Sequence, residues 1–204
     1  PLDRRNEHDW SRLCVASFES NVGAVEALVA LGADPNDEPP PLGAACWGRG
    51  DDPAATTRII EALLAAGAAV HRRDGAGWSL LHAAAMPYSH GDGLASSDGP
   101  NVAAMHALIS HGVAPDIRGP DGITPLMLVA GDGAFEAVDA LLVLGSDPSV
   151  RDDQGDRAYD HARSSEQQLT DLLETAPVEA LDPVRAFRDR ARRSAERLAA
   201  FGVG

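Results

Sequence analysis

The chain has 204 residues, which suffices for one ordinary domain or a short array of repeats. Its formal charge of −14 disfavours nucleic acid and anionic membranes as partners, and because all 17 of its basic residues are arginine it has no lysine for Schiff-base chemistry. No stretch is as long and apolar as a membrane span, and the first residues lack the apolar core of a secretion signal, so we expect a cytoplasmic protein.

One apolar pattern recurs from the start of the chain onward. In each copy a leucine lies in a short helix of small residues, and a glycine ends a second, more apolar helix. We call these two residues the marking leucine and the closing glycine. The pairs are Leu13 and Gly32, Leu42 and Gly67, Leu81 and Gly112, and Leu126 and Gly145. A degraded fifth copy has Tyr159 in place of the leucine. The recurrence predicts helix pairs that bury their apolar faces by stacking on one another.

The copies differ in their connections. The first predicts helices over residues 11–18 and 22–31, and the prolines of residues 37–41 shorten the link to the second copy. Extra residues separate the two helices of the second copy, at 47–57, and of the third, at 87–101. Because both insertions contain glycine and proline, we predict loops there. In the fifth copy we predict a turn followed by a short, polar second helix.

The fourth copy is the most regular. Its Thr124-Pro125-Leu126-Met127 stands where ankyrin repeats carry Thr-Pro-Leu-His, and residues 79–82, Ser-Leu-Leu-His, keep the histidine. The chain therefore resembles the ankyrin repeat family. The resemblance implies an all-α ankyrin-repeat solenoid of about five stacked helix-turn-helix units with finger loops, over residues 1–178. The repeats are placed near residues 10–36, 41–71, 75–116, 120–149 and 153–176.

The composition changes after Pro177. Asp182 and Pro183 are typical of a helix start, and an apolar stripe follows, so we predict an amphipathic helix over residues 182–201. Two interpretations stay open: the helix caps the last repeat, or it docks on a second copy to form a homodimer. Membrane binding is disfavoured because acidic residues interrupt the basic face.

Large side chains gather in two columns of the array. The positions three residues before and five residues after the marking leucine hold all three tryptophans, one phenylalanine and one methionine. Aromatic side chains are common anchors at interfaces. By the resemblance these columns lie along a concave groove of repeats one to three; the alternative is that the aromatic residues pack on each other. The predicted binding residues are Trp10, Phe18, Trp47, Trp78, Met86 and Tyr88, with Arg72, Arg73 and Arg118 of the finger loops.

The leading hypothesis for function is a non-catalytic scaffold that holds a protein partner in this groove. The alternative is a small-molecule-binding protein or an unusual enzyme, with a pocket closed by the loops 47–57 and 87–101. In that case His82, His90 and Asp92 are the candidate acid–base groups, although the resemblance gives His82 a structural role. No metal-ligand spacing is recognisable, so we expect no metal and no cofactor.

Overall fold

The computed structural model describes residues 4–48, 52–86, 99–175 and 181–201, and contacts divide the chain into two units, residues 1–114 and 115–204. Within these described ranges the regular structure is helical, without strands; two isolated bridges join Arg5 to Ser11 and Arg73 to Ser79. The predicted all-α class is thereby confirmed.

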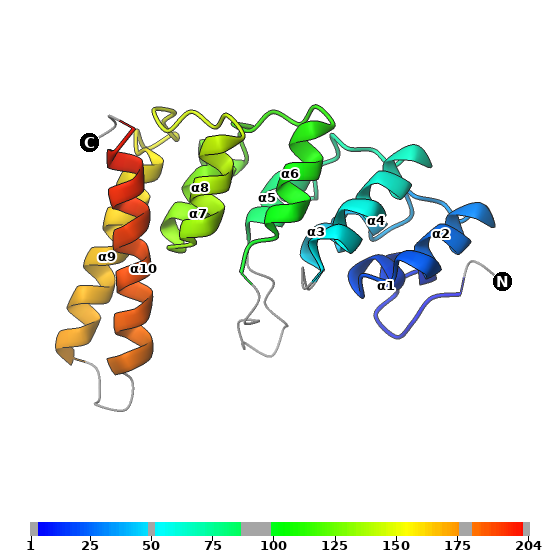
Figure 1. The fold of residues 1–204 in the computed structure, drawn as a ribbon, viewed down its shortest axis with the longest axis horizontal. Coiled ribbons are helices and arrows are strands. Elements are labelled where there is room, and N and C mark those ends of the chain that lie inside the picture. The colour runs from blue at the N-terminus through cyan, green and yellow to red at the C-terminus, as the bar shows by residue number, and fades with distance from the viewer. Residues whose placement is uncertain (1–3, 49–51, 87–98, 176–180, 202–204) are drawn as a thin grey trace. The chain divides into compact units, whose positions relative to one another are not determined.

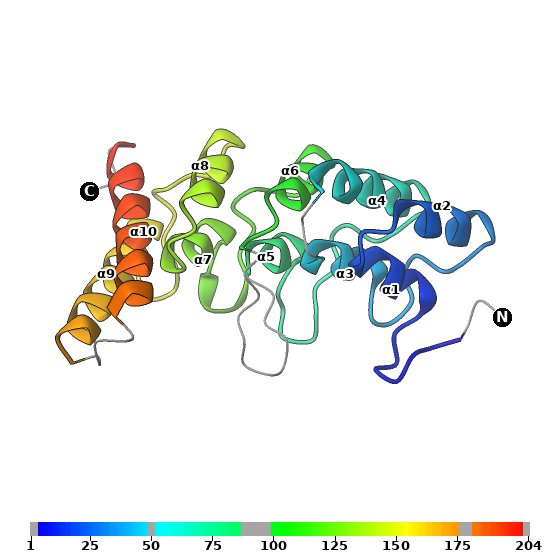
Figure 2. The same cartoon turned by 60° about the horizontal axis from the view of Figure 1, so that its bottom comes forward.

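The first unit contains three helix pairs in its described residues. The first helices of the pairs lie side by side in one row and the second helices in another, as Figures 1 and 2 show. The pairs are α1 (Arg12–Phe18) with α2 (Val22–Ala30), α3 (Pro41–Trp47) with α4 (Pro53–Ala65), and α5 (Leu80–Ala85) with α6 (Val102–Ser110).

The marking leucines explain how this row is packed. Leu13, Leu42 and Leu81 are almost completely buried, and small residues beside them let the short helices approach closely. Ser11 and Ser79 are the N-caps of α1 and α5, and each side-chain oxygen accepts a hydrogen bond from the backbone N–H three residues later. The sequence pattern and the local capping therefore specify the same helix starts.

The second unit continues the pattern and then departs from it. Its elements are η1 (Pro120–Gly122), α7 (Pro125–Gly131), α8 (Phe135–Val143), α9 (Ala158–Thr175) and α10 (Leu181–Ala199). Helix α9 packs on α7, and α10 packs on both α9 and α8, so that α9 and α10 run side by side in Figure 1.

Our prediction of a turn inside the fifth copy is wrong. Residues 158–175 form one uninterrupted helix, α9. In the fourth copy Gly131 and Gly133 help end α7, whereas the equivalent residues of the fifth copy are Ser164 and Glu166, which a helix accommodates. Helix α10 consequently takes the second-helix place beside α9.

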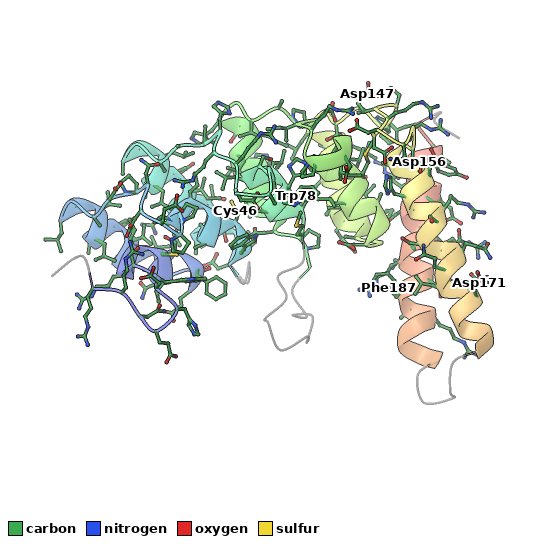
Figure 3. All side chains as sticks on the ribbon, turned by 180° about the vertical axis from the view of Figure 1, so that it is seen from behind. Cys46, Trp78, Asp147, Asp156, Asp171 and Phe187 are labelled. Atoms are coloured by element: carbon green, nitrogen blue, oxygen red, sulfur yellow. The ribbon has the colours of Figure 1, made fainter. Side chains whose placement is uncertain are left out.

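The apolar stripe of α10 packs within its own unit. Ala191, Ala195 and Leu198 are buried, and Arg197 pairs with Asp139 of α8. Figure 3 labels Phe187, a half-buried member of the stripe. These contacts join α10 to α8 and α9 of the same chain, and both the capping role and a homodimer through residues 182–201 stay predictions.

Candidate functional site

A closed turn positions Trp78 at the start of α5. The Asp74 carboxylate oxygen Oδ1 accepts hydrogen bonds from the backbone N–H groups of Ala76 and Trp78, each at 2.9 Å. The Asp74 N–H donates to the Trp78 carbonyl oxygen, also at 2.9 Å. Because the backbone N–H and C=O of Trp78 are both hydrogen-bonded within this turn, the turn fixes the main chain from which the indole projects. Trp78 is labelled in Figure 3.

Trp78 is one wall of a pocket between repeats two and three. The pocket has a volume of about 310 Å³. Three of the predicted binding residues meet there, namely Trp47 at the end of α3, Trp78 before α5 and Met86 after α5. All three side chains are half-buried. The floor and remaining walls are Pro39, Pro40, Gly43, Leu80 and Ala83.

Charged groups border the apolar walls. Arg72 and Arg73, both predicted binding residues, line the pocket together with Glu38 and Asp74. Arg72 forms an ion pair with Glu38, and Arg73 donates a 2.6 Å hydrogen bond to the Gly77 carbonyl oxygen. The guanidinium groups therefore also brace the finger loops, and the rim carries both signs of charge around an apolar interior.

Trp10 and Phe18 lie elsewhere in the first unit. Their ring centroids are 5.3 Å apart at an interplanar angle of 81°, an edge-to-face pair within repeat one. Neither residue lines the pocket of repeats two and three. The two columns are therefore divided between a packed pair in repeat one and a pocket in repeats two and three.

His82 is placed as a structural residue. Its side chain is fully buried, and its Nδ1 lies 2.7 Å from the Ser79 hydroxyl oxygen in the capping box of α5. The ring centroids of His82 and Trp78 are 5.2 Å apart, so the imidazole also supports the indole. His82 does not line the pocket.

Four predicted residues remain, three that the structure does not describe and one in the second unit. Tyr88, His90 and Asp92 lie outside the described residues. Arg118 belongs to the second unit, where its guanidinium donates to the Arg151 carbonyl oxygen at 2.7 Å and to Asp153 Oδ1 at 2.8 Å. Sequence reasoning did not assign the pocket residues Pro40 and Gly43. The sequence contained one signal for a pocket here, namely a glycine at position 43, directly after the marking Leu42.

Two further properties bear on what the site can bind. Over the described part of the chain, no cluster of three histidine, cysteine or acidic side chains has the arrangement of a metal site. Within the same residues, no helix combines the length and the apolar character needed to traverse a bilayer.

Comparisons with known proteins agree with the helix pairs. Residues 108–162 match the family model for ankyrin repeats in many copies. A curated relative is the E3 ubiquitin-protein ligase KEG of Arabidopsis thaliana, 28% identical over 172 residues. That match covers 79% of this chain and 10% of KEG, so the chain spans about a tenth of the relative's length. The family model thus identifies ankyrin repeats at residues 108–162, and the recurring helix pairs of the other described residues resemble them.

Proposed function

We propose that this protein is a non-catalytic scaffold whose pocket between repeats two and three holds an apolar side chain of a partner protein. Ankyrin repeats generally mediate protein–protein interaction, which supports a binding role. The observation that carries the proposal is the meeting of Trp47, Trp78 and Met86 around one pocket. Half-buried aromatic side chains in a concave, apolar site are the usual anchors of protein interfaces.

The rim supports a peptide-like occupant. Arg72 and Arg73 line the pocket together with Glu38 and Asp74. Charged or polar groups that flank an inserted apolar side chain would therefore meet charges of both signs. Since these rim groups already have intrachain partners, their role is to orient the partner rather than to supply most of the affinity.

The alternative function is the binding of a small apolar molecule. The volume of about 310 Å³ lies at the lower end of the range that is typical of ligand pockets, roughly 300–1,000 Å³. An enzymatic role has less support, because His82 is buried in the capping box and does not line the pocket.

The test uses a random 12-residue peptide library displayed on phage and selected on the whole chain. A selected peptide is labelled and titrated against the wild type and the variants Trp47→Ala and Trp78→Ala. We expect each variant to weaken binding by about 2 kcal/mol, roughly 30-fold, as for a truncated interface anchor. The matched control is Val143→Ala, since Val143 is exposed and lies in the other unit.

Urea denaturation separates binding from folding. If both tryptophan variants lose about 3–5 kcal/mol of stability, as a truncated core residue would, the aromatic side chains are structural and the proposal fails. It also fails if the selected peptides bind both variants as tightly as the wild type. Selected peptides that share no apolar residue would equally count against an apolar anchor.

A further inference from the structure

The third and fourth repeats begin their first helices with a reciprocal cap. The Thr124 hydroxyl oxygen accepts a hydrogen bond from the Met127 N–H at 3.3 Å, and the Met127 Sδ atom accepts one from the Thr124 N–H at 3.4 Å. Ser79 and His82 form the same capping box at the start of α5. Because Met127 and His82 are almost completely buried, each capping side chain fills space beside its helix.

Repeat two lacks both halves of this cap. Its N-cap is Pro40, which has no backbone N–H to donate, and the residue in the place of His82 and Met127 is Gly43, which has no side chain to accept. A capping side chain at position 43 would find no donor at position 40, so the glycine costs α3 no hydrogen bond. It leaves open the space that a side chain fills in the other two repeats.

This space belongs to the pocket between repeats two and three. Gly43 lines that pocket. A Cβ added to Gly43 would lie 3.3 Å from Pro40 Cγ and 3.7 Å from Leu80 Cδ2, and both of these residues line the pocket as well. A longer side chain at position 43 would therefore start between two pocket walls and occupy part of the pocket. The absence of a side chain at this position makes the pocket deeper.

The walls beside Gly43 offer little to a polar occupant. Leu80 is apolar, Pro40 has no N–H, and the Pro40 carbonyl oxygen already accepts a hydrogen bond in the first turn of α3, at 3.0 Å. The hydroxyl of Ser79, which also lines the pocket, lies 2.7 Å from His82 Nδ1. The charged residues of the pocket lie in the finger loops rather than on α3 or α5; they are Glu38, Arg72, Arg73 and Asp74. A charged group beside Gly43 would lose its water without gaining a partner.

We propose that Gly43 sets the depth of the pocket, and that the site thereby selects a partner side chain that is long and apolar to its tip. This inference rests on the proposed function, because it concerns the same pocket. The tip of the occupant takes the place of the missing capping side chain, between Pro40 and Leu80. Each methylene group buried there contributes roughly a fourfold gain in affinity. An alanine side chain is too short to reach this place, and a lysine side chain would bring its ammonium group to walls without an acceptor.

Amino-acid amides that differ in their tips serve as probes. N-acetyl-norleucinamide carries a linear apolar chain, N-acetyl-lysinamide ends a chain of similar length with an ammonium group, and N-acetyl-alaninamide carries a methyl group. Each probe is titrated into the isotopically labelled whole chain, and the indole N–H signals of the tryptophans are followed by NMR. We expect the norleucine probe to move the signals of Trp47 and Trp78, with a Kd about tenfold or more below those of the other probes. The Trp10 signal should stay in place, because Trp10 does not line this pocket.

Two variants fill the pocket from within. Gly43→Met supplies the side chain that repeat four has at this position and should raise the Kd of the norleucine probe by about tenfold or more. Pro40→Thr/Gly43→Met gives repeat two the complete Thr-Pro-Leu-Met cap of repeat four. This double variant should melt no lower than the wild type in circular dichroism and should show the same loss of affinity, which separates a filled pocket from a misfolded one. Gly23→Met adds the same side chain at an exposed glycine of α2 and should leave the Kd unchanged.

The outcomes separate this inference from the proposed function. The role of Gly43 is overturned if Gly43→Met and the double variant both bind the norleucine probe as tightly as the wild type. The selection for an apolar tip is overturned if the lysine probe binds as tightly as the norleucine probe, and the whole inference fails if no probe moves the Trp47 and Trp78 signals. The proposed function is judged instead by how the selected peptides bind to Trp47→Ala and Trp78→Ala. Peptides that lose affinity for both tryptophan variants but ignore Gly43→Met would leave the binding site in place and overturn only the role of Gly43.

Discussion

Gly133 allows α10 to pack on the fourth repeat, and its replacement by alanine tests this contact. The backbone of Gly133 has φ +64°, and an added Cβ would lie 2.7 Å from the Ala191 nitrogen and 3.0 Å from the Ala191 Cα. Both atoms are backbone atoms of α10, so rotation of a side chain cannot relieve the contact. Either α10 moves away or the turn after α7 changes its conformation.

The magnitude follows from two separate costs. A left-handed conformation costs a non-glycine residue about 1–2 kcal/mol. The displacement of packed backbone adds an overpacking cost of about 1–3 kcal/mol. We therefore expect Gly133→Ala to lower the free energy of unfolding by about 2–5 kcal/mol. Urea denaturation, followed by circular dichroism, measures this change.

Gly145 provides the matched control. It has φ +96°, and an added Cβ meets nothing within 4 Å. Gly145→Ala should therefore lower the free energy of unfolding only by the cost of the left-handed conformation, about 1–2 kcal/mol. In a chain that lacks residues 181–204 the contact with Ala191 is absent, and the costs of the two substitutions should become similar. Equal costs of the two variants in the whole chain would refute the reasoning, because α10 would then not press on Gly133.

Two shorter predictions concern the same unit. The Ser194 hydroxyl on α10 is buried with no hydrogen-bond partner in the described structure, so Ser194→Ala should raise the free energy of unfolding by about 1 kcal/mol in urea denaturation; no gain would mean that the hydroxyl is hydrogen-bonded. Burial opposes the ionisation of Asp152, but hydrogen bonds from Asp156, His161 and Gln154 outweigh it and lower its pKa. The stability that this carboxylate contributes should therefore be present above the pKa of the unfolded chain, about 3.9, and be lost as the pH falls towards the lower folded value. Denaturation at pH 7 and pH 3 measures this, and a pH dependence that is unchanged in Asp152→Asn would contradict it.

The fold could be predicted because it rests on local, repeated signals. The marking leucines are almost fully buried, and the closing glycines Gly32, Gly67, Gly112 and Gly145 all have φ between +85° and +96°. The structural role of such a leucine or glycine can be recognised from the residues of a single repeat. The fifth copy was harder, because the loss of its glycines left two short helical segments with nothing to separate them, and they joined as α9.

The arginine contacts could not be read from the sequence in the same way. Arg72 pairs with Glu38, and Arg118 pairs with Asp153, so each contact joins finger loops of neighbouring repeats. Residues this far apart in the chain meet only through the stacking of the repeats. A finger-loop arginine in a single sequence is therefore compatible both with a rim that binds a partner and with a brace between loops, and its position alone does not distinguish them.

The pocket itself depends on what repeat two lacks. The residue after the marking leucine is Cys14, His82 or Met127 in the other regular copies, but in repeat two it is Gly43. A Cβ at position 43 would lie 3.3 Å from Pro40 Cγ and 3.7 Å from Leu80 Cδ2, both on residues that line the pocket. In the same repeat Pro39 replaces the tryptophan that pairs with Phe18 in repeat one. Pro39 and Gly43 line the pocket together with Trp47. Repeat two therefore has a rigid and a small residue where repeat one has Trp10 and Cys14, and this difference, together with the aromatic residues, is why we propose repeats two and three as the binding site.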